Sequence, residues 1–269
     1  MDQLTIETID RFLEALATDH LDQLDLGNVR FVDPYALLLL RLLALEREEQ
    51  GYPLRIFWPQ APSIRQWMRD MGMPMTRFPM SRAAPVNDQS ALQPITEIEN
   101  EEGIGHVVDG FHDRLASRYP LTEASRRALV AVMIELFQNI PHHSNATGVA
   151  NNPHGIAAMQ DDEDSIFLAV ADKGIGLASS LGLRDGYENL SDAGALDVVF
   201  HQGASRFDDP GRGGELRRIA DLVHSWNGSF ALRSGCALYY FDSAGGNVID
   251  VPHFPGVQLG LRIPRQVFV

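Results

Sequence analysis

Apolar and polar positions in the N-terminal quarter of the chain switch repeatedly between a helical and a strand-like pattern. Residues 4–18, 35–49 and 61–71 have the apolar period of helices. Residues 24–32 and 54–58 are short segments rich in apolar residues, as strands are. Strands that alternate with helices predict a small α/β sheet.

The middle of the chain has longer periodic segments. We expect helices over residues 97–118 and 123–139. Residues 154–159 and 165–171 then predict a hairpin whose tip, residues 160–164, is acidic. The tip lacks the spacing of a calcium-binding loop, which favours a solvated loop.

The C-terminal third predicts more helices and the rest of a sheet. Helices are expected over residues 192–201 and 215–224. Pro255 and Gly256 have the backbone preferences of a turn directly before the last strand. The strands, expected to close an antiparallel sheet, cover residues 229–234, 237–241 and 257–263.

Composition changes between about Pro74 and Pro94, where periodic apolar residues give way to Met, Arg, Pro, Ser, Ala and Asn. We therefore expect two domains, residues 1–75 and 96–269, joined by a linker over 76–95. Both are predicted to be α/β. The second is predicted to be an α/β sandwich with a mixed, largely antiparallel sheet.

Three short blocks of chemically active residues occur in order along the second domain. Glu135 and Asn139 are four residues apart on a predicted helix, so both side chains point from one face. A carboxylate and an amide in that position suit an ATP-bound metal ion. Asp172 ends an apolar strand and can accept a hydrogen bond from a base, while Gly174 and Gly176 allow a tight turn.

The third block is rich in glycine and opens a helix. Gly211, Gly213 and Gly214 come directly before the helical pattern that starts at Glu215. Free N–H groups in such a loop can bind phosphate. The three blocks together predict a nucleotide pocket.

Glu135-Leu-Phe-Gln-Asn139, Asp172-Lys-Gly174-Ile-Gly176 and Gly211-Arg-Gly213-Gly214 resemble the motifs of the GHKL, or Bergerat-fold, ATPase domain. Gyrase-type topoisomerases, sensor histidine kinases and anti-sigma-factor serine kinases share this domain. The resemblance covers roughly residues 95–269. It implies ATP and Mg²⁺ as cofactors.

The resemblance also implies a role for each matching residue. Glu135 would be the general base, and Asn139 would bind Mg²⁺. Asp172 would bind the adenine amino group. Gly174 and Gly176 would shape the hinge of a nucleotide lid, and Gly211, Gly213 and Gly214 would lie against the phosphates. The expected lid, residues 203–210, is short, as in the serine-kinase branch.

Basic side chains near these blocks have two interpretations each. His142 and His143 could approach the phosphates, or they could be a solvent-facing pair that the helix dipole favours. Pro141 is expected to bend or end the helix just before them. Arg206 and Arg212 could bind phosphate oxygens or pair with neighbouring aspartates, and we favour phosphate for Arg212. A zinc site formed by His142, His143 and His154 lacks supporting carboxylate or cysteine spacing.

The first domain resembles a STAS domain, the fold of anti-sigma-factor antagonists. The resemblance rests on the segment Asp25-Leu-Gly-Asn-Val-Arg-Phe-Val-Asp33 and the apolar helix after it. Signalling members have Asp-Ser-Ser-Gly at the turn, with a phosphorylated serine, whereas this chain has Asp33-Pro34-Tyr35-Ala36. Since Pro34 has no hydroxyl, we favour a packing or dimerisation module over a phosphorylation switch.

Charge and cysteine content limit the partners. The formal net charge is -14, which opposes binding to nucleic acid or to an anionic membrane. Lys173 is the only lysine, so the lysine-containing P-loop motif is excluded. We expect a cytoplasmic protein for three reasons. The chain has a single cysteine, it has no apolar run long enough to span a bilayer, and its start lacks a signal-peptide pattern.

Two functions follow from these patterns. The first is an Mg·ATP-dependent regulatory enzyme that hydrolyses ATP or phosphorylates a partner protein on Ser or Thr, with the first domain recruiting the partner or self-associating. The second is a non-catalytic switch in which bound ATP changes the surface offered to a partner. A STAS or sigma-regulator protein as partner, and a homodimer, are expectations from the resemblance.

Overall fold

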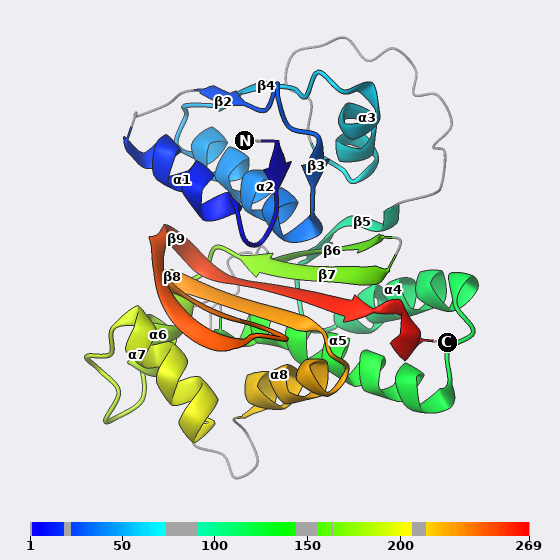
Figure 1. Cartoon of the computed structure of the whole chain (residues 1–269). Helices are drawn as coiled ribbons and strands as arrows, with labels where there is room; N and C mark the ends of the chain where they lie inside the picture. The colour runs from blue at the N-terminus through cyan, green and yellow to red at the C-terminus, as the bar shows by residue number, and fades with distance from the viewer. Residues whose placement is uncertain are drawn as a thin grey trace.

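The computed structural model describes residues 2–18, 23–73, 91–143, 155–162, 164–205 and 214–268. The fold is mixed α/β. Figure 1 shows three layers, with an N-terminal group of helices and short strands on one face of a sheet and further helices on the other face.

The N-terminal unit, residues 2–73, contains two pairs of short parallel strands and three helices. One strand pair is β1 with β3, and the other is β2 with β4. The predicted strand over 24–32 is therefore two strands in two different pairs. The predicted helix over 4–18 begins only at Ile9, because Leu4 pairs with Val32 in the first ladder. The elements are β1 (Gln3–Leu4), α1 (Ile9–Thr18), β2 (Gln23–Asp25), β3 (Phe31–Val32), α2 (Pro34–Glu49), β4 (Arg55–Phe57) and α3 (Pro62–Asp70).

Helix α2 begins where its sequence indicates. Asp33 is its N-cap, and Oδ1 of Asp33 accepts a hydrogen bond of 2.8 Å from the N–H of Ala36. The other carboxylate oxygen accepts from the N–H of Ile6, also at 2.8 Å. Pro34 is the first helical residue, where its missing N–H costs nothing. Burial raises the pKa of Asp33 to about 7.

The second part of the chain is built on a five-stranded sheet in the order β5-β6-β7-β9-β8. Every described pairing in it is antiparallel, and the parallel pairs occur only in the N-terminal unit. Strands β6 and β7 form the predicted hairpin. The strands are β5 (Ala91–Ile98), β6 (Gly155–Asp161), β7 (Ser165–Asp172), β8 (Ser229–Asp242) and β9 (Gly245–Pro264).

Strand β5 corrects two sequence-based expectations. It begins at Ala91, so the end of the range 76–95 that we assigned to the linker is part of the sheet. It also occupies the start of the predicted helix over 97–118, which begins only at Ile104. Polar residues and Pro94 within β5 hide its strand character in the sequence.

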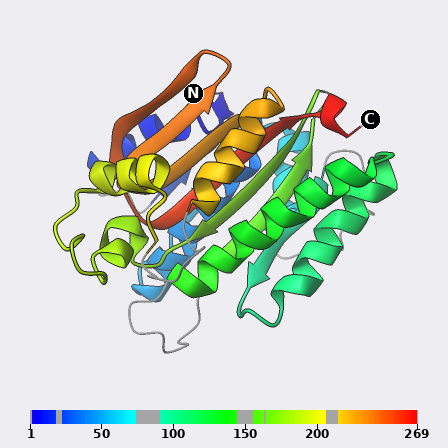
Figure 2. The same ribbon diagram turned by 90° about the horizontal axis from the view of Figure 1, so that it is seen from below.

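The helices of the second part lie on the sheet face opposite the N-terminal unit, as Figures 1 and 2 show. Alternate residues of the strands point to opposite faces, and the two cores divide accordingly. Leu168 and Val170 pack with the helices, whereas Ala169 and Ala171 pack with the N-terminal unit. These helices are α4 (Ile104–Arg118), α5 (Glu123–His143), α6 (Gly176–Leu181), α7 (Asp192–Asp197), the π-helix η1 (Val198–Gln202) and α8 (Glu215–Ser225), with a final 3-10 turn, η2 (Arg265–Val267).

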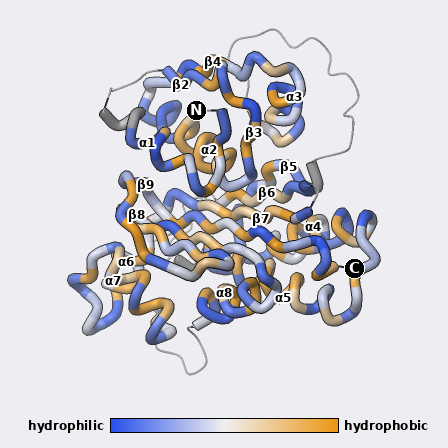
Figure 3. Tube along the Cα trace, in the orientation of Figure 1, coloured by the Kyte–Doolittle hydropathy of each residue, from blue (hydrophilic) through white to orange (hydrophobic). Residues whose placement is uncertain are grey.

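The N-terminal unit is an integral layer of the fold. Residues Pro34 to Leu40 of α2 are all buried, and apolar residues gather where the layers meet (Figure 3). Among the residues that the structure describes, two ion pairs cross the contact. Lys173 pairs with Glu49 at the end of α2, and the fully buried Arg233 pairs with Asp10 of α1.

Strands β8 and β9 form one long hairpin instead of three separate strands. The predicted strands over 229–234 and 237–241 are both parts of β8. We expected a turn at Pro255 and Gly256, but these residues form a bulge inside β9. Ser234 pairs with Val257, whereas the next residue of β8, Gly235, pairs with Phe254, so Pro255 and Gly256 are left out of the pairing. Gly256 has φ 79°, and a Cβ there would lie 2.2 Å from the carbonyl oxygen of Asp172.

Within the described residues, the search for a helix with the length and apolar character to cross a membrane finds none.

Candidate functional site

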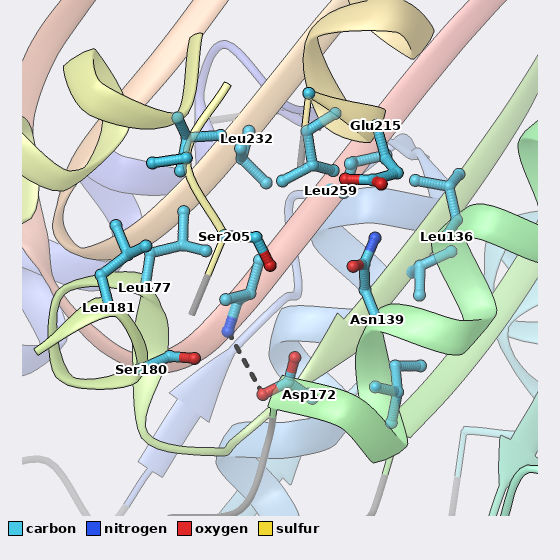
Figure 4. A pocket seen from close by; sticks show the side chains of 17 residues that line it. Leu136, Asn139, Asp172, Leu177, Ser180, Leu181, Ser205, Glu215, Leu232 and Leu259 are labelled. Atoms are coloured by element: carbon cyan, nitrogen blue, oxygen red, sulfur yellow. Dashed lines mark hydrogen bonds between the residues drawn. The ribbon is translucent and has the colours of Figure 1, made fainter. Parts of the chain in front are cut away.

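A pocket lies between the sheet and the helices of the second part. It encloses about 740 Å³ of space, part of which is open to solvent. Asn139, Asp172 and Gly214 all line it, although they come from three different blocks of the sequence. Figure 4 shows polar side chains around an otherwise apolar cavity. The other lining residues are Leu136, Ile140, Val170, Leu177, Ser180, Leu181, Val199, Ala204, Ser205, Glu215, Leu216, Leu232, Val257 and Leu259.

Asp172 provides a buried carboxylate at the floor of the pocket. Its Oδ1 accepts hydrogen bonds from the N–H groups of Gly174 at 2.7 Å and Val257 at 3.4 Å, the second of which is the dashed line in Figure 4. Within the described part of the chain, Oδ2 has no hydrogen-bond partner. Burial raises the pKa of Asp172 to about 6, and the two N–H donors partly offset this. Its free oxygen can therefore accept a hydrogen bond from a ligand.

Glycines hold the chain in position after Asp172. The bond from Gly174 closes a tight turn, and Gly176 has φ 75°. A Cβ on Gly176 would lie 3.0 Å from Oγ of Ser234, which accepts a hydrogen bond from the N–H of Leu177 at 2.8 Å. Gly174 and Gly176 do not line the pocket, but they place Asp172 and the start of α6 at its wall.

Asn139 reaches the pocket from α5. Its Nδ2 donates a hydrogen bond of 2.8 Å to the backbone oxygen of Glu135, one helical turn earlier. This bond orients the amide, and Oδ1 has no hydrogen-bond partner among the described residues. An amide oxygen held in this way is a suitable Mg²⁺ ligand.

Glu135 is not among the residues that line the pocket. It is half-buried on α5 and does not line the pocket, although Leu136 and Asn139 do. Helix α5 ends at His143, two residues beyond Pro141. The side chains of Pro141 and His143 lie outside the described residues, as does His154, so the interpretations that depend on the histidines stay predictions.

The N-terminus of α8 forms another part of the wall. Gly214 is the N-cap with φ 77°, and a Cβ on Gly203 would lie 3.4 Å from the Gly214 Cα. The two ends of the intervening segment therefore approach each other at the pocket. Gly211, Arg212 and Gly213 lie outside the described residues, together with most of the expected lid and Arg206.

Most of the pocket wall was not predicted from the sequence. Val170, Leu232 and Leu259 come from the sheet, and Leu177 and Val199 come from α6 and η1. An apolar wall is suited to the faces of a planar ring. Of these residues, only Val170 could have been predicted from the sequence. It lies two residues before Asp172 on strand β7, so the alternation of side chains puts both on the same face of the sheet.

The described pocket lining has no positive charge of its own. Asp172 and Glu215 are acidic, and no lysine, arginine or histidine is among the described lining residues. No group of three His, Cys, Asp or Glu side chains in the described part of the chain could hold a metal ion by itself. The oxygen atoms of Asn139 and of the acidic residues nevertheless suit a hard cation that shares its coordination with a ligand.

Neither the protein-family models nor the curated proteins that were compared with this chain match it.

Proposed function

We propose that this chain is a regulatory protein that binds Mg·ATP in the pocket between α5, α6, α8 and the sheet. One observation carries the proposal: Asn139, Asp172 and Gly214, each from a different predicted nucleotide-binding block, line the same pocket. The agreement in space is independent of the order of the blocks in the sequence, on which the GHKL resemblance rested.

Each part of ATP has a matching group. Oδ2 of Asp172 accepts a hydrogen bond from the adenine amino group, and the apolar side chains of Val170, Leu177 and Leu259 cover the ring. The N-terminus of α8 at Gly214 offers N–H groups to the phosphates. Oδ1 of Asn139 would hold Mg²⁺, which neutralises phosphate charge when bound.

Turnover is a separate part of the proposal. Glu135 precedes Asn139 by one turn on α5, and as a general base it would orient a water or a serine or threonine hydroxyl toward the γ-phosphate. Its position outside the pocket lining favours the second candidate, in which ATP occupancy alone changes the surface offered to a partner.

The wider assignments follow the same proposal. The N-terminal unit covers the sheet face opposite the pocket, which supports a packing or self-association role for it. A STAS or sigma-regulator protein as partner, a homodimer and a cytoplasmic location are proposals that rest on the sequence resemblance and composition.

Calorimetric titration with Mg·ATP tests the binding. We expect a Kd in the micromolar range, or about −8 kcal/mol, and loss of binding in Asn139→Ala. Gln138→Ala is the matched control, because it removes a neighbouring amide that does not line the pocket. Equal affinity of Asn139→Ala and the native chain would refute the site.

Incubation with γ-labelled ATP then separates the two candidates. Release of free phosphate that is lost in Glu135→Ala identifies an ATPase. Label on a partner protein that is lost in Glu135→Ala identifies a kinase. Partner control that survives Glu135→Ala but not Asn139→Ala identifies a nucleotide-gated switch.

A further inference from the structure

Asp172 lies just past the end of the ladder between β7 and β9. On its other side it is still paired with Gly155 of β6. The last paired residues of β7 and β9 are Ala171 and Gln258, and beyond them β9 is bulged. A carboxylate that accepts a hydrogen bond from a ligand has to be held precisely, so other contacts must fix Asp172 on the β9 side.

The side chain of Gln258 continues the link between the strands where the ladder stops. Its Nε2 donates a hydrogen bond of 3.1 Å to the backbone oxygen of Asp172 and one of 2.7 Å to the backbone oxygen of Pro255. One amide thus joins the end of β7 to the bulge of β9. The two strands are close at this point, since a Cβ on Gly256 would lie 2.2 Å from the same Asp172 oxygen. These contacts fix the backbone from which the Asp172 carboxylate projects.

Gln258 reaches Asp172 from the sheet face opposite the pocket. Its paired residue Ala171 packs with the N-terminal unit, whereas Val257 and Leu259, on either side of Gln258, line the pocket. Gln258 is 0% exposed, and the N-terminal unit covers this face of the sheet (Figure 1). It therefore does not contact a nucleotide and acts on one only through Asp172.

The surroundings of Gln258 belong to the contact between the layers. The residue opposite it on β8 is the buried Arg233, which pairs with Asp10 of α1. Among the described residues, Oε1 of Gln258 and Nε of Arg233 are both buried and have no hydrogen-bond partner. A buried amide with an unused acceptor costs stability, so stability alone does not favour a glutamine here.

We propose that Gln258 is a positioning residue that holds Asp172 in the orientation that selects a base with an exocyclic amino group. The inference rests on the proposed ATP site. Without the bond from Gln258 the end of β7 is free to shift, and the hydrogen bond from the base to Asp172 weakens. The phosphates bind elsewhere in the pocket, at the N-terminus of α8, and their contacts do not depend on Gln258. Because Gln258 lies beneath the N-terminal unit, that layer takes part in the selectivity of the pocket.

The test compares the Kd of ATP with that of purine riboside triphosphate, both with excess Mg²⁺. The analogue has the same phosphates and lacks the amino group. In the native chain we expect ATP to bind about tenfold tighter or more, as a hydrogen bond to a charged group implies. Gln258→Met keeps an unbranched side chain of similar length and removes the donor. It should lower the ratio of the two Kd values by at least about threefold through weaker ATP binding, and leave the Kd of the analogue unchanged within about twofold.

Gln160→Met is the matched control. Gln160 is a second buried glutamine, 6% exposed, and it lies on the same sheet face as Ala158, which packs with the N-terminal unit. It pairs with Phe167, near the other end of β7 from Asp172. The change should leave the Kd ratio at the native value.

Gln258→Asn tests the same bond if Gln258→Met does not fold. It keeps an amide at the buried site, but the shorter side chain does not reach both backbone oxygens. It should lower the Kd ratio in the same way.

The outcomes separate the role of Gln258 from the ATP site beneath it. A Kd ratio in the Gln258 variants equal to the native ratio overturns the role of Gln258 and leaves the ATP site intact. Equal weakening of both nucleotides also overturns it, because that result indicates general damage to the pocket. A native chain that binds both nucleotides equally well overturns the selection of the amino group by Asp172, and a native chain that binds neither overturns the ATP site itself.

Discussion

Replacing Asp172 with asparagine should stabilise the fold and abolish nucleotide binding. The carboxylate is 6% exposed, and its pKa of about 6 lies above the ordinary value of 3.8. Asparagine has the same shape, and its oxygen can accept the hydrogen bonds from Gly174 and Val257. Its NH₂ group, however, takes the place of Oδ2 and cannot accept from an adenine amino group.

The pKa difference sets the size of the stability gain. One pKa unit corresponds to about 1.4 kcal/mol, so the ionised Asp172 lowers the free energy of unfolding by about 3 kcal/mol. Between the two pKa values the folded protein holds a proton that the unfolded chain has lost. Stability therefore decreases as the pH rises from about 4 to about 6 and is constant above that, as far as Asp172 is concerned.

Urea unfolding of both proteins between about pH 4 and about pH 8 isolates this contribution, because other titrating groups such as Asp33 cancel in the difference. Asp172→Asn should match the native chain near the acidic limit and exceed its free energy of unfolding by up to about 3 kcal/mol at neutral pH. A difference that does not change with pH, or a variant less stable at every pH, would refute the reasoning.

Three further substitutions test the fold. Gly256→Ala should lower the free energy of unfolding by about 1–3 kcal/mol or more, because the φ of Gly256 is 79° and an added Cβ would collide with the backbone of Asp172. The control is Gly105→Ala in helix α4, which has open space around it and should be neutral or stabilising in the same urea melts. Asp161→Ala removes the buried acceptor of a cluster with two partly exposed arginines and a tyrosine and should cost about 1–3 kcal/mol, seen as a lower Tm. Arg233→Ala should cost more, about 3–5 kcal/mol, because this fully buried arginine leaves its aspartate partner uncompensated; a loss below about 1 kcal/mol by urea melts would contradict the account of the layer contact.

The sequence predicted those helices and strands whose apolar pattern is complete within a short segment of the chain. The helix from Glu215, the long helix α2 and the β6–β7 hairpin occur where the apolar pattern placed them. The same reasoning brought Asn139 and Asp172 to one pocket, because each lies on a well-marked element.

The missed features depend on contacts between distant segments. Strand β5 is polar and contains Pro94, and it is a strand because it pairs with β6, more than fifty residues later. The bulge at Gly256 is set by the register of β9 against β8, which no local pattern encodes. Pocket-lining residues such as Leu259 have the same apolar pattern in the sequence as ordinary core residues, so the sequence does not distinguish them.

Photo-crosslinking with 8-azido-ATP in the presence of Mg²⁺, followed by peptide mapping, tests the central claim most directly. The account predicts label on peptides that contain residues 170–181 or 257–259, protected by excess ATP and absent in Asp172→Asn. Label that ATP does not displace, or protected label confined to the N-terminal unit, would contradict a nucleotide site in this pocket.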